Sequence, residues 1–522
     1  MYASSEQRLT RLINAGHARL LAGGLKGLEK EGLRVASDGW IADTPHPSAL
    51  GSALTHPYIT TDFSEALIEL ITPPFANVAD TVDFLSGIHQ FVYPHLGEEL
   101  LWASSMPCRV GGDESIPLAD YGSSNVGRMK RVYRDGLKNR YGSVMQTIAG
   151  IHYNYSFPDA LWSAWGEIEQ DRRPTRELIS DGYFRLVRNF QRFGWLMPYL
   201  FGASPAICKT FVGPGAAGFS ELDGGTWYRP HATSLRMSDI GYSNKNKAAL
   251  RISYNHLDDY IESLSRAIST PFPEYESIGL KRDGEYLQLN TNFLQIENEY
   301  YSFIRPKQVA HSGEKPTLAL KRRGVQYVEI RALDLGVFDP TGVNEEQLRF
   351  IEAFLAFCMF QDSPPVGEDE QGSIENNQSL VAERGRDPSL TITVSGERRP
   401  VREWAKAICE GMTGFCELLD EPEEGSPYSN ALARQLEAVN DTEQMPSTRV
   451  LSEMMTAKES FFEFAMRKSI EFQEHFEQRP LSTVRRREFE VMAEQSLTKQ
   501  TEIEADDEQG FDEYLQTYFS QS

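Results

Sequence analysis

The sequence predicts an α+β protein built on a mainly antiparallel sheet. Residues 151–157 alternate polar and aromatic side chains with a period of two, which is typical of a strand with two different faces. A turn signal at residues 283–284 lies between apolar runs, as in a β-hairpin. Strands and helices show no regular alternation, so a doubly wound parallel fold is not expected.

The expected elements before residue 270 are mixed. An amphipathic helix over residues 5–22 should end at the glycine pair 23–24, and the strand of residues 26–35 then carries Glu29 and Glu31. A second strand covers residues 67–72, with Glu69 between apolar neighbours. Further helices are expected over residues 81–93, 173–200 and 246–268.

The chain beyond residue 280 begins with strands and then becomes helical. We expect a strand end before the turn at 283–284 and a second strand-like run through Leu289 and Ile296. An apolar helix follows at 348–360, then an exposed acidic loop at 361–378, and the last twenty residues should be loosely held. Helical patterns fill residues 401–419, 428–439, 448–477 and 482–499. We expect a single unit, 1–522, with a sheet-based part (about 20–345) and a mostly helical part (about 346–522).

Composition and charge exclude several classes of protein. The 522 residues include 52 Lys and Arg against 75 Asp and Glu, a net charge of −23, which argues against nucleic-acid and anionic-membrane partners. No stretch approaches the ~20 apolar residues of a transmembrane helix, and the N-terminus lacks the features of a signal peptide. The five cysteines form no CxxC pair and are widely spaced, so we expect reduced thiols and a cytoplasmic protein.

Four strand-like stretches each place two polar or charged residues two positions apart. These pairs are Glu29 with Glu31, His152 with Asn154, Glu297 with Glu299, and Glu329 with Arg331. Residues i and i+2 of a strand share one face, so the four pairs would together form a wall rich in carboxylates. Such a density of charge is costly to bury without compensation. Divalent cations and an anionic, cation-chelating nucleotide would supply that compensation.

Simpler interpretations remain open for each pair. Glu29 and Glu31 suit a solvent-facing strand edge, His152 suits a hydrogen-bonded core histidine, and Glu329 with Arg331 suits a cross-strand ion pair. Glu69 lies in a run of apolar residues, where a carboxylate is usually paired, ligating or at an exposed edge. If a metal binds, the predominance of oxygen ligands favours magnesium or manganese over zinc.

Recognised phosphate-binding loops are absent from the sequence. Residues 213–218 are glycine-rich but lack the Lys-Ser/Thr ending of a Walker motif, and we expect a mobile loop or lid there. The basic stretch 127–142 is either an amphipathic surface helix or an anion-binding element above the site. The polar, turn-rich segment 233–245 suits a loop that grips a small zwitterion.

Several long strings make a specific resemblance. In chain order they include GLEKEGLRV, MQTIAGIHYNYSFP, YLFGASPAIC, ATSLRMSDIGYSNK, LQIENEYYSFIRPK and VEIRALD. Together, over about residues 20–360, they strongly resemble bacterial glutamate–cysteine ligases of the proteobacterial type. The resemblance implies a glutamine-synthetase-like curved antiparallel sheet that forms a funnel-shaped active site. It also implies that ATP phosphorylates the γ-carboxylate of L-glutamate and that the amine of L-cysteine displaces phosphate, the first step of glutathione synthesis.

The resemblance assigns roles residue by residue. It implies two or three Mg²⁺ ions, with Mn²⁺ as an alternative, and ATP as co-substrate. Arg331, with Glu329 and Arg134, would act on the transferring phosphoryl group, and Arg236 would clamp the glutamate carboxylate. The magnesium shell would be Glu29, Glu31, Asp62, Glu69, His152 and Glu329, of which Glu29, His152 and Glu329 would hold an ion that bridges the nucleotide phosphates. The cysteine pocket would be lined by Tyr133, Gln146 and Asn154, with Tyr242 and Tyr301 near the carboxylate.

Alternative functions follow from the same residues. A γ-glutamyl ligase with another amine acceptor would share the metal shell, and a metal-dependent phosphohydrolase would replace the amine with water. A catalytically dead binder is disfavoured because every acidic ligand is present. Feedback inhibition by glutathione is also expected from the resemblance, and a chain of this length should make only the dipeptide. Residues 361–400 depart from the family pattern and contain no cysteine, so thiol-based control through them is not expected.

Overall fold

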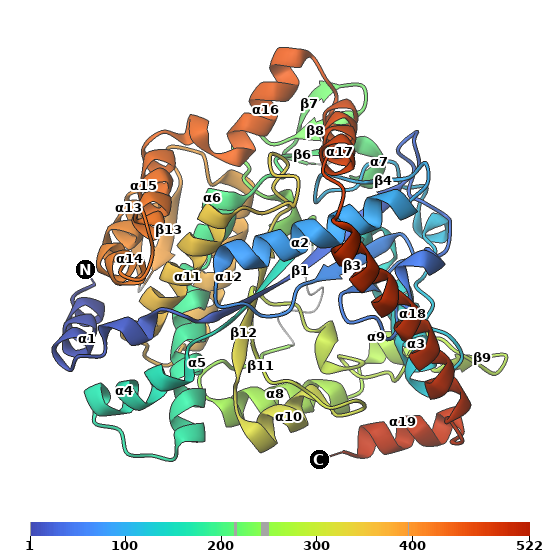
Figure 1. Cartoon of the computed structure of the whole chain (residues 1–522), viewed down its shortest axis with the longest axis horizontal. Helices are drawn as coiled ribbons and strands as arrows, with labels where there is room; N and C mark the ends of the chain where they lie inside the picture. The colour runs from blue at the N-terminus through green and yellow to red at the C-terminus, as the bar shows by residue number, and fades with distance from the viewer. Residues whose placement is uncertain (1, 213–216, 242–249, 395, 522) are drawn as a thin grey trace.

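A seven-stranded antiparallel sheet forms the centre of the computed structural model, which describes residues 2–212, 217–241, 250–394 and 396–521 (Figure 1). The strand order is β11-β12-β5-β1-β3-β2, and β4 pairs with the end of β1. The prediction of a mainly antiparallel α+β fold is confirmed. The strands are β1 (Leu25–Val35), β2 (Ile59–Thr61), β3 (Leu67–Ile71), β4 (Leu100–Leu101), β5 (Ile151–Ser156), β11 (Ile304–Lys307) and β12 (Tyr327–Leu333).

Strand β1 runs through the middle of the sheet and has two different faces. On one face, Lys26 pairs with Glu352 of α11 (Glu345–Phe360) at 2.9 Å, and Lys30 Nζ lies 2.9 Å from His89 Nε2 of α2 (Val78–Val92). These two helices therefore cover the back of the sheet, and burial lowers the pKa of Lys30 to about 7. Glu29 and Glu31 project from the opposite face. The alternative that they lie on a solvent-facing edge is wrong, because β3 and β5 flank β1 on both sides.

The predicted N-terminal helix is shorter than expected. Helix α1 spans Ala3–Asn14, and a separate 3₁₀ turn covers Ala18–Leu21. Gly16 between them has a φ of 79°, which a continuous α-helix cannot contain. The helices predicted at 81–93 and 173–200 are confirmed as α2 and as α5 (Thr175–Phe193) with α6 (Leu196–Phe201). Only the second half of the helix predicted at 246–268 is observed, as α8 (Leu257–Ser269); residues 250–256 are not helical, and residues 246–249 lie outside the described part.

The prediction for residues 280–304 is only half right. A short hairpin, β9 (Lys281–Arg282) and β10 (Glu285–Tyr286), turns at residues 283–284 as expected. The strand-like run through Leu289 and Ile296 is not a strand, and Glu297–Glu299 form a 3₁₀ turn outside the sheet. Glu297 Oε1 instead accepts a hydrogen bond from Thr317 Oγ1 at 2.6 Å, and Glu299 Oε1 pairs with Arg140 Nη1 at 3.0 Å. The prediction that Glu297 and Glu299 project together from the sheet wall is therefore wrong, although Glu299 still lines the cavity described below.

Two other local predictions are also wrong. The expected acidic loop at 361–378 contains most of helix α12 (Glu368–Arg384), because three acidic residues in its first turn favour the helix dipole and Ile374 and Val381 anchor it in the core. The last twenty residues are not loosely held. They form the end of α18 and helix α19 (Phe511–Ser520), whose Phe511 and Leu515 are buried.

Helices dominate the chain after residue 345, as predicted. The later helices are α13 (Val401–Gly411), α14 (Thr413–Asp420), α15 (Pro427–Asn440), α16 (Pro446–Ala457), α17 (Phe461–Glu477) and α18 (Thr483–Ala505), and one hairpin joins β13 (Thr391–Val394) to β14 (Glu397–Pro400). No helix among the described residues is both long and apolar enough to cross a bilayer. The remaining elements are α3 (Asn125–Tyr141), α4 (Asp159–Glu169), α7 (Lys209–Val212), α9 (Pro273–Ile278), α10 (Pro316–Arg323), β6 (Ala206–Cys208), β7 (Ser220–Asp223) and β8 (Thr226–Tyr228).

The cysteines do not all remain reduced. Cys108 and Cys208 form a disulfide with their Cα atoms 5.1 Å apart, although 100 positions separate them in sequence. Cys358, Cys409 and Cys416 are free and buried. The prediction of five reduced thiols is wrong, because sequence spacing gives no information about a contact that only the fold creates.

Candidate active site

A cavity of about 480 Å³ opens on the face of the sheet that carries Glu29 and Glu31. Strands of the sheet form one wall, and helices α3 and α19 contribute to the other. Asn154 does not line the cavity but donates a hydrogen bond from Nδ2 to Glu29 Oε1 at 2.8 Å. Tyr242 lies outside the described residues. Twelve of the fourteen site residues singled out in the sequence line the cavity: Glu29, Glu31, Asp62, Glu69, Tyr133, Arg134, Gln146, His152, Arg236, Tyr301, Glu329 and Arg331.

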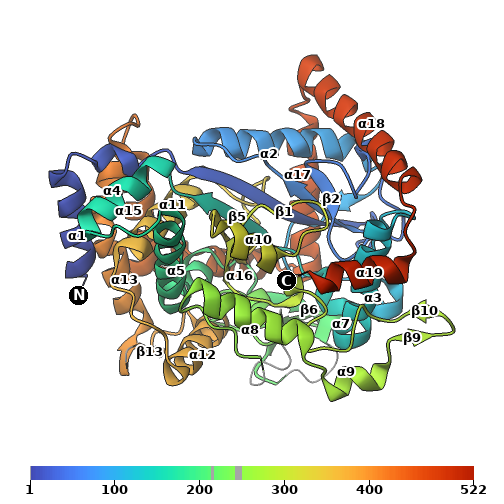
Figure 2. The ribbon, with the colours of Figure 1, turned by 90° about the horizontal axis from the view of Figure 1, so that it is seen from below.

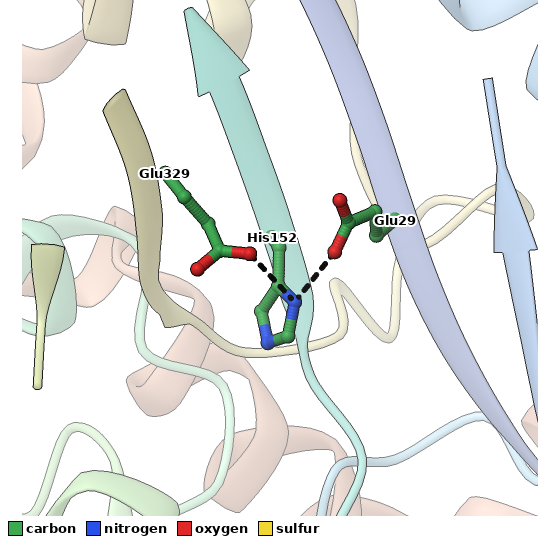
Figure 3. A group of neighbouring side chains, drawn as sticks. All are labelled: Glu29, His152 and Glu329. Carbon is green, nitrogen blue, oxygen red and sulfur yellow. Dashed lines mark hydrogen bonds and ion pairs between the residues drawn. The ribbon is translucent and has the colours of Figure 1, made fainter. Parts of the chain in front are cut away.

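Three neighbouring strands bring Glu29, His152 and Glu329 together (Figure 3). Glu29 of β1 lies opposite His152 of β5 in the sheet register, and Glu329 of β12 lies opposite Asn154. His152 Nδ1 is 3.1 Å from Glu29 Oε2 and 3.9 Å from Glu329 Oε1. One ligand atom from each of the three residues lies within 4.8 Å of the other two. The strand pairing therefore creates a three-residue group that could hold a metal ion.

Further carboxylates crowd the same face. Glu69 of β3 lies directly opposite Glu31 of β1 in the register. Burial raises the pKa of Glu69 well above its ordinary value, and the nearby carboxylates of Glu29 and Asp62 raise it further. Burial likewise raises the pKa of Glu31. Both pKa values are raised because ionised carboxylates on this face would repel one another with little water to offset the repulsion.

A divalent cation fits this arrangement. Glu329 Oε2 is buried and has no hydrogen-bond partner among the residues that the structure describes. Hard carboxylate oxygens with one imidazole nitrogen are ligands that Mg²⁺ and Mn²⁺ accept. The unpartnered oxygen and the raised pKa values of Glu31 and Glu69 both indicate a site that a cation would complete.

Cationic side chains lie beside the group Glu29, His152 and Glu329, on the side of the sheet where β11 pairs with β12. Lys307 Nζ lies 3.2 Å from Glu329 Oε1, and Arg305 pairs with Glu329 in the strand register. Burial alone would raise the pKa of Glu329, but Lys307 and Arg331 hold that pKa well below the usual range. Arg331 is half-buried, and although loss of water lowers its pKa, the charge of Glu329 more than offsets this effect and the pKa is raised. Arg305 and Lys307 were not among the sequence candidates, although they are two positions apart in the string that ends in IRPK.

Helix α3 turns one face of the basic stretch toward the cavity. Lys130, Tyr133, Arg134, Leu137 and Tyr141 recur at helical spacing and line it. The two interpretations of this stretch therefore combine, because the helix is amphipathic and its inner face lines the site. Burial, with the neighbouring Arg134, lowers the pKa of Lys130 to about 8.

Arg134 is fixed in place by backbone carbonyls. Its Nε donates to Asp62 O and its Nη1 donates to Lys130 O at 2.9 Å. The guanidinium also lies over the ring of Tyr121, 4.6 Å from its centroid. Arg134 therefore holds the backbone at Asp62 next to helix α3.

Arg236 lies on the other side of the cavity, in the 3₁₀ turn Leu235–Met237, and is 1% exposed. Its Nη2 donates to Arg331 O at 3.0 Å. Gly150 makes room for the guanidinium, because a Cβ at that position would lie 2.0 Å from Arg236 Nη2. Tyr301 OH lies 3.3 Å from Met237 Sδ, which places the Tyr301 ring beside the same turn.

Sequence reasoning missed several residues of the cavity wall. Thr60 lies opposite Glu69 in the register of β2 and β3, and its polar side chain gave no separate signal. Tyr514 and Tyr518 belong to the C-terminal helix, which the sequence analysis treated as a loose tail. Their spacing of four positions was the available signal, but it does not reveal what the helix packs against.

Carboxylates, an imidazole and several cationic side chains around one cavity are typical of enzymes that transfer phosphoryl groups. Comparison with known proteins gives the family. The sequence profile described as glutamate-cysteine ligase matches residues 9–381. The chain belongs to the glutamate–cysteine ligase family and is a ligase.

Relatives match over nearly the whole chain. A glutamate–cysteine ligase of Alcanivorax borkumensis is 47% identical over 98% of this chain and 99% of its own length. One from Pseudomonas aeruginosa is 48% identical over 98% of this chain and 97% of its own.

Solved structures give the same result for the fold. The crystal structure of glutamate–cysteine ligase from Francisella tularensis in complex with AMP has a TM-score of 0.90 and 36% identity, covering 95% of this chain and 98% of that one. A bifunctional glutathione synthetase from Pasteurella multocida shares the fold at a TM-score of 0.74 and 24% identity, over 93% of this chain and 58% of that one.

Proposed function

We propose that this chain joins the γ-carboxylate of L-glutamate to the amine of L-cysteine at the expense of ATP. The products are γ-glutamylcysteine, ADP and phosphate. The observation that carries the proposal is the group Glu29, His152 and Glu329 bordered by Lys307 and Arg331 in one cavity. Such a cavity suits phosphoryl transfer, and membership of the family supplies the identity of the acceptor.

Magnesium is the cation that we propose for the acidic face. Glu29, His152 and Glu329 would hold one ion, and Glu31, Asp62 and Glu69 would complete the shell of one or two more, for which manganese could substitute. When bound, the ions would neutralise the phosphates of ATP and the repulsion among the carboxylates. The crystal structure of the Francisella tularensis relative is a complex with AMP, which supports the binding of a nucleotide by this chain.

Arg331 is the residue that we propose to steady the transferring phosphoryl group. Its guanidinium stays protonated because the charge of Glu329 outweighs the effect of burial on its pKa. A protonated fork of N–H donors matches the phosphoryl oxygens on which charge develops. The charge of Glu329 keeps this cation protonated, and Arg134 of α3, bonded to the backbone of Asp62, adds a further positive charge to the wall.

The amino acids would bind beside the phosphoryl group. Arg236 would clamp the glutamate carboxylate, and Tyr133, Gln146 and Tyr301 would line the cysteine pocket, with Tyr242 as a further prediction. Asn154 is better suited to orienting Glu29, to which it donates a hydrogen bond. The glutamate γ-carboxylate then attacks the terminal phosphorus and releases ADP. The cysteine amine next attacks the acyl carbon, loses a proton and expels phosphate.

The assay that tests the function is phosphate release from Mg-ATP and L-glutamate with different acceptors. We expect release to require both glutamate and cysteine and to match dipeptide formation, with ammonia and no acceptor giving little. Phosphate release that does not depend on the acceptor would contradict ligase activity. A preference for another amine would leave the ligase chemistry in place but replace cysteine as the acceptor.

Feedback by glutathione and the place of the reaction are further parts of the proposal. Glutathione carries a γ-glutamyl and a cysteinyl part, which would occupy both amino-acid pockets at once. Competition kinetics test this, because a glutathione that fails to compete with glutamate would remove the idea. We still propose a cytoplasmic location, although the Cys108–Cys208 disulfide removes the argument from reduced thiols, and we treat residues 1–522 as one catalytic unit.

A further inference from the structure

Helix α19 lies beside α3 (Figure 2) and contributes side chains to the cavity lining, although it is far along the chain from the strands of the sheet. Its buried residues Phe511 and Leu515 form an apolar cluster with Met129 of α3 and with Leu289. The family profile ends at residue 381, so this helix lies beyond it. Its packing nevertheless makes it part of the cavity wall.

Polar contacts hold both ends of the helix. At its start, Asp512 pairs with Lys281 of the β9–β10 hairpin at 3.0 Å. At its end, Lys315 Nζ donates to the carbonyl oxygens of Phe519 at 2.8 Å and Gln521 at 3.1 Å. The helix is thus tied to two segments that are separate in sequence, and the one that carries Lys315 follows strand β11.

Tyr514 and Tyr518 are the residues of α19 that line the cavity. They are four positions apart and share one face of the helix, whereas Glu513, Gln516 and Thr517 are exposed. Both tyrosines are half-buried, and burial raises the pKa of each, so the hydroxyls are neutral. Two uncharged aromatic rings therefore face the cavity at the end formed by the last helix.

The chemistry of the three substrates decides what these rings meet. Glutamate and cysteine are small zwitterions, so most of their surface needs charged or polar partners. The triphosphate needs cations, and Lys307 and Arg331 lie on the sheet beside the acidic group. Gly313 and Glu314, which follow Lys307 along the chain, also line the cavity and lead to the Lys315 contact with α19. The purine base is the one large, flat, uncharged part among the substrates, and such a base packs well on tyrosine.

We propose that α19 forms the base-binding wall of the nucleotide site, with Tyr514 and Tyr518 as the side chains on which the purine packs. This inference rests on the proposed use of ATP. It makes the C-terminal helix a determinant of nucleotide affinity, although it lies outside the segment that defines the family.

The test compares a nucleotide with a ligand that lacks the base. Calorimetric titrations would measure binding of Mg-ADP and of Mg-pyrophosphate to the full-length protein and to its Tyr514→Ala and Tyr518→Ala variants. We expect each substitution to weaken Mg-ADP binding by roughly tenfold, since stacking on a base is worth that order of affinity. Pyrophosphate affinity should change by less than about twofold, because pyrophosphate does not reach the rings.

Controls separate base binding from a structural role. Gln516→Ala changes an exposed position of the same helix and should leave both affinities unchanged. Tyr518→Phe keeps the ring and should retain most of the Mg-ADP affinity. An equal loss of ADP and pyrophosphate affinity in the alanine variants would overturn the inference, and so would an effect confined to the KM for cysteine. A protein that forms dipeptide normally but shows unchanged ADP binding in the alanine variants would refute the inference and leave the proposed function intact.

Discussion

Glu29 and His152 lie directly opposite each other on neighbouring strands, with Nδ1 of the histidine 3.1 Å from Oε2 of the glutamate. Asn154, two positions along β5, donates to the other oxygen of the same carboxylate. The carboxylate is therefore oriented by two side chains of one strand. A ligand held this rigidly loses little entropy when it binds an ion.

Glu29→Gln should abolish turnover while the protein remains folded. The amide keeps the shape and the hydrogen bond from Asn154 but removes the charge that would hold the metal. We expect kcat to fall by at least about 100-fold at saturating magnesium, as for the loss of a main electrostatic group. Dipeptide formation and the circular dichroism spectrum are the measurements. Near-normal activity at saturating magnesium would contradict the metal role.

Glu69→Gln should stabilise the protein when metal is removed. Burial and the neighbouring carboxylates raise the pKa of Glu69, so its ionised form is unfavourable in the folded protein at neutral pH. In EDTA we expect the free energy of unfolding to rise by about 1 kcal/mol, as a like-charge repulsion is relieved. Magnesium should then stabilise the natural protein more than the variant, through binding to the folded state alone.

The exposed Glu424 offers a matched control for that experiment. Glu424→Gln makes the same chemical change away from the cavity and should alter stability little in either condition. Denaturant unfolding with EDTA and with magnesium gives both comparisons. A Glu69→Gln protein that is less stable than the natural one in EDTA would show that the carboxylate is already well compensated without metal.

Arg331→Lys should slow the chemical step more than it weakens nucleotide binding. Lysine keeps a positive charge beside Glu329 but lacks the planar fork of donors that matches a phosphoryl group. We expect kcat to fall by about 100-fold with a smaller change in the KM for ATP. Arg282→Lys, on the exposed β9 strand, is the control. A variant that changes only the KM for ATP would assign Arg331 to ground-state binding.

The sequence was sufficient to predict residues that neighbouring strands bring together. The period of two in a strand fixes the face on which Glu29, His152 and Glu329 lie. Whether the three side chains meet then depends only on the order of the strands in the sheet. The same spacing failed for Glu297 and Glu299. Their carboxylates bond to Thr317 of α10 and Arg140 of α3, partners outside the sheet that the local spacing does not reveal.

Other parts of the site depend on contacts that no local pattern contains. Tyr514 and Tyr518 reach the cavity only because Phe511 and Leu515 pack on α3, more than 300 positions earlier in the chain. The acidic composition around them favoured a loose tail, and a few well-placed apolar residues outweighed it. The pairing of Cys108 with Cys208 has the same origin, since the fold alone brings the two together.

Reduction of that disulfide should destabilise the protein. It links residues 100 positions apart, and disulfides typically contribute about 2–4 kcal/mol to stability, more for longer loops. Denaturant unfolding with and without dithiothreitol should show the difference, and the double variant Cys108→Ser with Cys208→Ser should be insensitive to the reductant. Thiol titration of the unfolded, unreduced protein should find the three free cysteines and no more. A count of five free thiols would show that Cys108 and Cys208 are not joined by a disulfide.

Acid should destabilise the protein through His56. Its Nδ1 accepts hydrogen bonds from the backbone N–H groups of Tyr58 at 3.1 Å and Ile59 at 2.9 Å, and burial lowers its pKa to about 4. The unfolded chain binds this proton at about pH 6.5, so the folded protein prefers the neutral ring. The stabilisation is complete above pH 6.5 and is lost as the pH falls toward 4, by about 3 kcal/mol in all.

His56→Asn isolates this contribution. The asparagine oxygen can accept the same backbone hydrogen bonds but does not titrate, so the free energy of unfolding should fall less steeply between pH 6.5 and 4 than in the natural protein. His311→Asn, at an exposed position, is the matched control and should leave the slope unchanged. Urea unfolding at a series of pH values measures all three proteins. A slope that is the same in the natural protein and in His56→Asn would show that His56 does take up its proton in the folded state, with the ring turned away from the two N–H groups.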